Sequence, residues 1–408
     1  MFFKDTILEV LKSPGSPHAI EPEVRRTLLA DLPPMGESAL VLKGVRRCGK
    51  STLQGQLRRA HKAIIQCNFE DPRLYGLTAA DFPAFLDAVN EAAPENAAIF
   101  FDEVQEIPGW EKLVRALLDR GRRVCVTGSN ASLLGREVGA KLTGRHISFE
   151  VQPFSYSEYL VFTGQEPGVD SLRRFLEVGG FPMHIHAGQP QILRELLRDI
   201  IERDIAHRHH LRETRHLMNL ALFLLANPGQ PLSMQSLTKA LAIPSVNQTS
   251  RHLEHLADAY LILPLQKHHA SFKQRIVTPA KYYPIDNGLK MANTPQSTSD
   301  LGRRLETQVF LELRARGEKI AYDGEREVWE CDFVSNEFAI QVCAELTPAN
   351  TDREIGGLVR ACKNAPHTRR KALLVTLDQR GKKSVDGISI EILPAWSWLT
   401  RGRRTSLI

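Results

Sequence analysis

The segment at residues 44–52, GVRRCGKST, has the residue types and the spacing of a loop that grips phosphate groups. Its glycines allow the backbone to curl so that successive N–H groups point inward at phosphate oxygens. The Lys50 ammonium can reach the β- and γ-phosphates, and the Ser51 hydroxyl can ligate Mg²⁺. We therefore expect a nucleotide to bind here, held by Gly44, Val45, Arg46, Arg47, Cys48, Gly49, Lys50, Ser51 and Thr52.

Two acidic residues follow an apolar run that is typical of a buried strand. Residues 98–101 read AIFF, and Asp102 and Glu103 come directly after them. The ligand crevice of a parallel sheet lies at the carboxyl ends of its strands. We expect Asp102, with Ser51, to hold Mg²⁺, and Glu103 to orient or deprotonate the attacking water. The alternative is a strand that ends in solvated acids, which the upstream loop makes the weaker interpretation.

Asn130 and Arg145 are candidates for contact with the γ-phosphate or its transition state. Ser129 or Asn130 could act as a sensor of the γ-phosphate, and a turn that caps the next helix explains these residues equally well. Arg145 could act as an arginine finger in its own or in a neighbouring subunit's site. Arg136 competes for that role, and a surface arginine with a local partner is the alternative for Arg145.

Strands and helices must alternate to place these residues. Residues 39–42 are a short apolar run before the loop, and residues 51–62 carry helix formers throughout. Further apolar runs at 63–67, 98–101, 124–126 and 147–151 alternate with helical patterns at 79–92 and 110–120. This alternation predicts an α/β fold with a parallel sheet and helices on both faces, spanning residues 1–153.

The composition is that of a soluble globular protein with several domains. The chain has 408 residues, of which 42% are hydrophobic and 25% are charged. Its net charge of +6 and its pI of about 9.0 permit contact with nucleic acid without requiring it. The six cysteines are scattered, as in reduced proteins, and residues 1–12 read as an amphipathic helix and not as a signal peptide. No apolar run reaches membrane-spanning length, so we expect a cytoplasmic protein with no membrane partner.

The middle of the chain reads as helices. Helical patterns at 154–162 and 171–178 end in Gly-Gly-Phe-Pro at 179–182, where the glycines stop a helix and the proline prevents its resumption. A long amphipathic helix is expected at 191–208, and we assign residues 154–215 to a helical lid. The histidines at 207, 209, 210 and 216 lack the carboxylates and the spacing of a metal site, so a solvated helix face is the favoured interpretation.

Residues 216–283 have the layout of a winged-helix domain. Three helical stretches at 216–226, 234–242 and 246–258 precede a strand at 260–265 and a hairpin at 267–283. In a version that binds double-stranded DNA, the third helix and the hairpin would present Asn247, Gln248, Arg251, His252, Lys273, Arg275 and Lys281. A module that binds a protein partner is the alternative. DNA is favoured only narrowly, because the third helix carries a single arginine.

The motifs together resemble one bacterial and archaeal group of AAA ATP-binding proteins. Besides the phosphate loop they are NFEDPRL at 68–74, IFFDEVQEI at 99–107, TGSNASLL at 127–134, LTGR at 142–145, GGFP at 179–182 and YYPIDNGL at 282–289. The resemblance covers nearly the whole chain. It implies a P-loop ATPase that binds ATP, followed by a C-terminal domain of unknown function (family 4143) that is similar to the PD-(D/E)XK, restriction-endonuclease-like fold.

The resemblance implies a small α/β domain at residues 284–408 with four acidic or basic positions. That nuclease fold carries an acid on a helix, an acid on one strand and a Glu-x-Lys on the next strand. Glu306 and Asp332 match the first two positions, whereas Gln341 and Cys343 stand where the Glu and Lys should be. An amide is a poor Mg²⁺ ligand and a thiol supplies no ammonium. Glu345, expected on the same strand face, could substitute in part, and we expect a domain that binds without cleaving.

The leading hypothesis is an ATPase that uses ATP and Mg²⁺ and couples its nucleotide state to a C-terminal half that binds DNA or a protein partner. One alternative is a nucleotide-gated nuclease effector, against which Gln341 and Cys343 count. The other is a non-hydrolysing switch or scaffold in which ATP locks an interface. A homo-oligomer is compatible with an Arg145 that acts in a neighbouring subunit.

Overall fold

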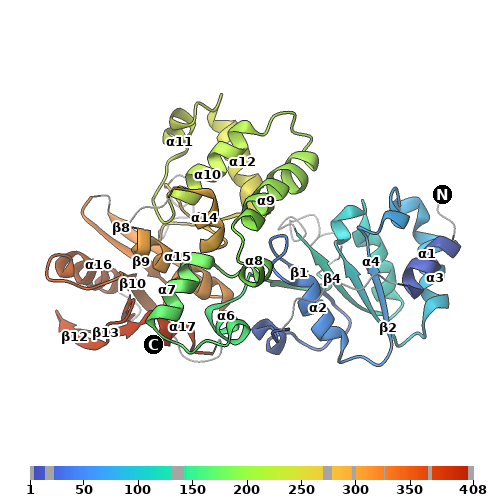
Figure 1. Cartoon of the computed structure of the whole chain (residues 1–408), viewed down its shortest axis with the longest axis horizontal. Helices are drawn as coiled ribbons and strands as arrows, with labels where there is room; N and C mark the ends of the chain where they lie inside the picture. Colours follow the sequence, from blue (N-terminus) through green and yellow to red (C-terminus); the bar gives the residue numbers. More distant parts are fainter. Residues whose placement is uncertain are drawn as a thin grey trace. The chain divides into compact units, whose positions relative to one another are not determined.

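The computed structural model (Figure 1) describes residues 4–13, 23–129, 142, 144–269, 278–295, 300–325, 327–365 and 370–402. Its internal contacts divide the chain into two compact units. Unit 1 comprises residues 1–152 together with 258–260, and unit 2 comprises residues 153–257 and 261–408. Within the described residues, no helix is both long enough and apolar enough to cross a membrane.

Unit 1 is built on a five-stranded sheet with the strand order β2-β3-β4-β1-β5. All neighbouring strands in it are parallel. The strands are β1 (Ala39–Lys43), β2 (Ile64–Asn68), β3 (Ala98–Asp102), β4 (Arg123–Gly128) and β5 (His146–Glu150). The central strands β1, β3 and β4 are buried along almost their whole length, as parallel strands covered on both faces must be. The predicted parallel sheet is therefore confirmed.

Helices cover both faces of this sheet (Figure 1). The helices α1 (Lys4–Lys12), α3 (Phe82–Ala92) and α4 (Trp110–Asp119) share one apolar core with strand side chains such as Val41 and Phe101. The helix α2 (Lys50–Arg58) packs on β1, β3 and β4. Neighbouring strand residues such as Leu42 and Phe100 are buried outside that core. Successive side chains of a strand point to opposite faces, so Leu42 and Phe100 lie on the face opposite to Val41 and Phe101. The prediction of helices on both faces is therefore confirmed.

Unit 2 begins with helices. They are α6 (Tyr156–Thr163), α7 (Val169–Val178), α8 (Pro182–Ala187) and α9 (Gln191–Asp199). The expectation that Pro182 keeps the chain out of helix is wrong, because Pro182 starts α8 at a position where its missing N–H costs nothing. The long helix expected at 191–208 changes geometry, since α9 continues as the π-helical segment η6 (Ile200–His207). The lid assignment of residues 154–215 stays a prediction.

Asp286 ties two of the sequence motifs together within unit 2. Its carboxylate accepts hydrogen bonds from Gly180 N at 2.6 Å and from Leu289 N at 2.8 Å. The second bond caps the helix α14 (Asn287–Asn293), which was not predicted. A Cβ on Gly288 would lie 2.1 Å from the carbonyl oxygen of Val178, so only glycine fits there. The GGFP and YYPIDNGL motifs therefore have a structural role at one shared contact.

The three helices expected in residues 216–258 are present. They are α10 (Arg215–Ala226), α11 (Met234–Ala240) and α12 (Val246–Asp258), and β6 (Ile262–Leu265) pairs antiparallel with β7 (Lys281–Pro284). The winged-helix arrangement itself stays a prediction. The expected exposure of His252 and Lys281 is wrong: both side chains are buried, and His252 lies 3.3 Å from Gln248. Lys273 and Arg275 lie outside the described residues.

The C-terminal part of unit 2 is a mixed six-stranded sheet with the order β12-β13-β11-β10-β9-β8 (Figure 1). Its strands are β8 (Ala321–Glu325), β9 (Trp329–Val334), β10 (Phe338–Val342), β11 (Lys371–Thr376), β12 (Gly381–Val385) and β13 (Ile388–Pro394). The pairs β8-β9, β9-β10 and β12-β13 are antiparallel, whereas β10, β11 and β13 run parallel to one another.

Three helices accompany this sheet. They are α15 (Leu301–Ala315) before β8, α16 (Thr351–Lys363) between β10 and β11, and α17 (Ala395–Leu399) after β13. The helix α16 packs on β9 and β10. The strands β8 and β12 were not predicted. Glu345 lies beyond the end of β10 and is exposed, so its expected place on that strand is wrong. The likeness to a nuclease fold stays a prediction.

Candidate functional site

The strand order places the phosphate loop and the acidic pair at one edge of the unit 1 sheet. The loop follows β1, the acids end β3, and β4 lies between these two strands. Since all three strands are parallel, their carboxyl ends meet at the same edge. Residues more than 50 positions apart in the chain can therefore act on one ligand.

The two glycines of the loop are required by close contacts. A Cβ on Gly44 would lie 2.0 Å from the carbonyl oxygen of Val151. Gly49 has a φ of 99°, and a Cβ there would lie 2.5 Å from Nη1 of Arg26. Such a backbone conformation is available to glycine at little cost. The loop is thus packed against Val151 and Arg26, and it leads directly into the start of α2, where a helix N-terminus favours a phosphate ligand.

The Lys50 side chain is buried and turns back onto the loop. Its ammonium donates to the carbonyl oxygens of Gly44 and Val45, both at 3.1 Å. It also lies 3.8 Å from Oε1 of Glu103. One ammonium therefore links the loop to the acid that follows β3.

Ser51 and Asp102, the two expected Mg²⁺ ligands, are in direct contact. The Ser51 hydroxyl donates to Oδ2 of Asp102 at 2.7 Å, and the Thr127 hydroxyl donates to Oδ1. Burial, and then the neighbouring Glu103 carboxylate, raise the pKa of Asp102, while the two hydroxyls and Lys50 oppose that shift. A hydroxyl and a carboxylate are hard oxygen donors of the kind that Mg²⁺ prefers. The residues therefore fit the metal that the family implies.

Glu103 stands in an unusual backbone conformation. Its φ is 51°, in a region that costs a non-glycine residue about 1 kcal/mol or more. Thr127 accepts a hydrogen bond from Glu103 N at 3.1 Å, and Gln105 donates to the Glu103 carboxylate at 2.5 Å and to Ser129 at 3.3 Å. These contacts hold the carboxylate at the mouth of the site. Thr127 and Gln105 both lie in sequence motifs, at 127–134 and 99–107, but sequence reasoning gave neither a role, because only the folded structure brings them to Glu103.

Arg26 is a second residue that the sequence did not reveal. Its guanidinium donates to the carbonyl oxygen of Cys48 at 2.8 Å and to that of Gln152 at 2.6 Å. Its own N–H donates to Gln56 of α2 at 2.9 Å. A buried arginine thus braces the phosphate loop against the last residue before the chain leaves unit 1. No local pattern marks it, because its partners are 22 and 126 positions away.

Of the remaining candidates for contact with the γ-phosphate, the structure describes Arg145 but not Asn130 or Arg136. Arg145 forms an ion pair with Asp119 at 2.6 Å and donates to the carbonyl oxygen of Leu118 at 3.1 Å. Both charged side chains are substantially exposed, so this pair is weak and the guanidinium can be drawn to another anion. Asn130 and Arg136 lie outside the described residues.

Unit 2 holds a separate cluster of charged side chains around Lys281. The Lys281 ammonium lies 3.3 Å from Glu306, 2.8 Å from Glu330 and 3.4 Å from Asp332. Burial opposes the charge on Lys281, but the carboxylates, with Glu306 first, raise the pKa of Lys281 well above its usual range. Burial, and then Glu306, raise the pKa of Asp332. The structure thus brings Glu306 and Asp332 together, as the sequence predicted, and adds a lysine that the sequence did not predict there.

The position expected for a Glu-x-Lys carries no free metal ligand. Gln341 accepts from Asp332 N at 3.2 Å and donates to Glu354 at 2.8 Å, so its amide is used at both ends. Burial, and then Glu354, raise the pKa of Cys343 to about 12, and this thiol stays neutral. Among the residues that the structure describes, no group of three or more His, Cys, Asp and Glu side chains is arranged to hold a metal ion.

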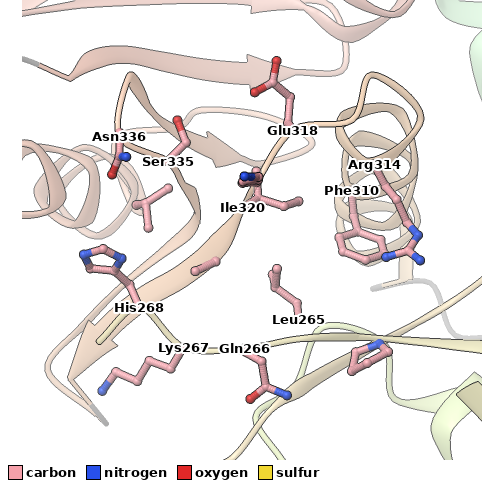
Figure 2. Close-up of a pocket in the computed structure, with 14 residues that line it drawn as sticks. Leu265, Gln266, Lys267, His268, Phe310, Arg314, Glu318, Ile320, Ser335 and Asn336 are labelled. Carbon is pink, nitrogen blue, oxygen red and sulfur yellow. The ribbon is translucent and has the colours of Figure 1, made fainter. Parts of the chain in front are cut away.

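Two cavities of unit 2 differ in charge. The charged cluster opens into a cavity of about 1300 Å³, which is lined by seven carboxylates and three cationic side chains. Figure 2 shows the other, of about 490 Å³, where Phe310 and Arg314 of α15 face the segment Leu265 to His268. Its charged side chains are Lys267, Arg314, Lys319 and Glu318. Only the larger cavity contains residues that the sequence singled out for chemistry.

Comparison with protein families assigns most of the chain to two models. Residues 36–160 match the model described as AAA domain. Residues 169–300 match a model described as domain of unknown function (DUF8612). The matched domain of unknown function is therefore not the family 4143 that the motifs suggested, and it precedes the C-terminal sheet.

Two relatives align with nearly the whole chain. The uncharacterized protein MJ1544 of Methanocaldococcus jannaschii is 31% identical over 437 residues, covering 98% of this chain and 95% of the relative. An uncharacterized protein of Haemophilus influenzae is 30% identical over 384 residues, covering 87% of this chain and 93% of the relative.

Two solved structures show a distant likeness. The Orc1 protein of Aeropyrum pernix, solved in complex with DNA, is 14% identical with a TM-score of 0.32 and covers 71% of this chain and 95% of its own. Cdc6p of Pyrobaculum aerophilum is 12% identical with a TM-score of 0.28 and covers 64% and 91%. The match of residues 36–160 shows that the chain carries an AAA-type ATPase domain. Because the two relatives are at least 30% identical over most of its length, the chain belongs to the family of MJ1544.

Proposed function

We propose that unit 1 binds and hydrolyses Mg·ATP and that its nucleotide state is passed to a binding surface of unit 2. The loop at residues 44–52 supplies backbone N–H groups, and Lys50 supplies the charge that the β- and γ-phosphates require. Ser51 and Asp102, already 2.7 Å apart, would hold Mg²⁺. When bound, the ion supplies charge neutralisation on the transferred phosphoryl group.

The chemical roles follow from where the side chains lie. Glu103 would orient the attacking water and accept its proton, held in place by Gln105. Asn130, which follows β4 by two positions in the sequence, would contact the γ-phosphate. Arg145 would leave its exposed pair with Asp119 to neutralise transition-state charge, in its own or in a neighbouring subunit's site.

One observation carries the proposal of coupling. The loop contacts the carbonyl oxygens of Val151 and Gln152, the last two residues of the stretch 1–152 of unit 1. The Cys48 thiol donates to Val151 O at 3.1 Å, Gly44 lies against the same oxygen, and Arg26 bridges Cys48 O and Gln152 O. A shift of the loop on nucleotide binding must therefore move residues 151 and 152 or break these contacts. Pro153 follows at once and begins unit 2.

We propose that unit 2 binds its partner without cleaving it. Gln341 is fully hydrogen-bonded and Cys343 is a neutral thiol, so neither replaces the acid and the lysine of a nuclease site. Of the four residues of α12 that were predicted to face DNA, Asn247 and Arg251 are exposed, Gln248 is partly exposed and His252 is buried. A single positive charge binds a phosphate backbone weakly, which favours a protein partner over duplex DNA.

Calorimetry and turnover test this proposal together. Titration of Mg·ATP into the full chain should release or absorb heat, and Lys50→Ala should abolish the signal whereas Lys112→Ala, on the exposed side of α4, should not. Absence of heat with the folded wild-type chain would overturn the proposal. Phosphate release is then measured with and without duplex DNA. If DNA stimulates phosphate release, the partner is DNA and not a protein. If ATP binds but is not hydrolysed, the chain is a non-hydrolysing switch and not an ATPase.

A further inference from the structure

The Lys281 ammonium lies between two of the three carboxylates of the charged cluster, those of Glu306 and Asp332. It comes from β7, and it lies within 3.4 Å of Glu306 of α15 and of Asp332 of β9. The side chain of Lys281 is 1% exposed and that of Asp332 is 6% exposed. The side chains of one cation and two anions, from three separate elements, thus lie together in the interior of unit 2.

The carboxylates are held from their other sides as well. The Tyr283 hydroxyl donates to Oε1 of Glu306 at 2.6 Å, and Val342 N donates to Oδ2 of Asp332 at 2.9 Å. Gly229 lies so close to Glu306 that a Cβ there would be 2.7 Å from Oε1. Neither acid can therefore turn away from the ammonium, and the geometry is fixed by packing.

We propose that Lys281 is the resident cation of this cluster and that it takes the position at which a divalent metal ion would bridge Glu306 and Asp332. A Mg²⁺ ion needs oxygen ligands at about 2.1 Å, and Mn²⁺ prefers the same oxygen ligands. The Lys281 ammonium already contacts one oxygen of each acid. An ion and an ammonium in the same gap would repel each other strongly in a buried site.

Removal of the ammonium should turn the cluster into a metal site. Without Lys281, the carboxylates of Glu306, Asp332 and the partly exposed Glu330 would face one another with no cation between them. Uncompensated buried charge is strongly unfavourable, so a divalent ion would be drawn into the gap. Because the cluster lies wholly in unit 2, its metal binding can be measured without nucleotide.

A matched control exists in the same unit. Lys290 is also buried, at 3% side-chain exposure, and pairs with Asp300. Asp300 is the one carboxylate that pairs with Lys290 among the described residues. Loss of this lysine should destabilise the chain but should leave too few oxygen ligands for a divalent ion.

The test is a titration of the nucleotide-free full chain with Mn²⁺, read by the electron paramagnetic resonance signal of free Mn²⁺. Lys281→Met should gain a site at least about tenfold tighter than any in the wild type. The double variant Lys281→Met/Asp332→Asn and the control Lys290→Met should gain none. A folded Lys281→Met that gains no site would overturn the proposal.

A second comparison does not depend on the folding of Lys281→Met. Wild type and Asp332→Asn, which both keep the lysine, should bind equal amounts of Mn²⁺. Loss of a bound ion in Asp332→Asn would show that the wild-type cluster already holds a metal, which would overturn the proposal.

Discussion

The Ser51 hydroxyl donates a 2.7 Å hydrogen bond to Asp102, so the first turn of α2 is tied directly to the end of β3. Ser51→Ala removes the hydroxyl that we propose as a metal ligand, together with this hydrogen bond, while leaving the loop backbone unchanged. We expect half-maximal ATP turnover to require about tenfold more Mg²⁺, because one oxygen ligand is lost. Turnover measured against Mg²⁺ concentration checks this. Ser51→Thr keeps the hydroxyl and should restore the wild-type curve; an unshifted Ser51→Ala curve would remove Ser51 from the metal site.

Glu103 is predicted to act on the attacking water and not on binding. Glu103→Gln keeps the size of the side chain and removes its charge and basicity. We expect kcat to fall by about 10²- to 10³-fold, with little change in the affinity for Mg·ATP. Phosphate release and calorimetry on the same sample separate the two effects. Glu106→Gln, three residues on and exposed, is the control. An unchanged kcat in Glu103→Gln would show that another residue acts on the attacking water.

Arg26 is predicted to position the phosphate loop. Arg26→Ala leaves the carbonyl oxygens of Cys48 and Gln152 without their charged donor, which should cost about 2 kcal/mol of stability. We also expect KM for ATP to rise about tenfold with a smaller change in kcat, because the loop binds and does not react. Urea unfolding and steady-state kinetics measure both. Arg25→Ala, exposed and adjacent, should change neither. A loss of stability with unchanged KM would limit Arg26 to a structural role.

Asp286 should make the stability of unit 2 depend on pH in an unusual direction. Burial raises the pKa of Asp286 to about 6, from an ordinary 3.8, although three backbone N–H groups oppose the shift. In the folded state the carboxyl takes up a proton as the pH falls through 6, before the unfolded chain does. The unfolding free energy should therefore rise between pH 6 and pH 4, by up to about 3 kcal/mol, and fall again as pH rises.

The variant Asp286→Asn isolates this contribution. The stability of the wild type minus that of the variant, measured by urea unfolding from pH 7 to pH 4, should increase towards acid pH. A difference that decreases towards acid pH would mean that the hydrogen bonds from Gly180 and Leu289 outweigh burial and keep the carboxylate charged.

The features that could be predicted are those whose chemistry is local in the sequence. The phosphate loop and the strand that ends in Asp102 are short segments in which residue type and spacing alone carry the signal. Their meeting at one edge follows from the general geometry of parallel sheets, which the regular alternation of strands and helices predicted. The helices α10 to α12 were found for the same reason, because their period is visible within each segment.

The features that were missed depend on partners far along the chain. Nothing in the sequence around Arg26 distinguishes it from an ordinary surface arginine. Its role becomes visible only from its hydrogen bond to the distant Gln152. Lys281 was expected to be exposed because the winged-helix interpretation placed it on the hairpin at 267–283, facing DNA. Its burial is decided by Glu306 and Asp332, which follow it by 25 and 51 positions. No pattern within β7 could have revealed them.

The support of the phosphate loop by Val151 and Gln152 has a practical consequence for anyone who wishes to express the ATPase module alone. A protein shortened to end with β5 at Glu150 would keep the phosphate loop, Asp102 and Glu103 but would lose the carbonyl oxygens of Val151 and Gln152 that Gly44, Cys48 and Arg26 contact. A truncation that extends through Gln152 should keep the loop intact.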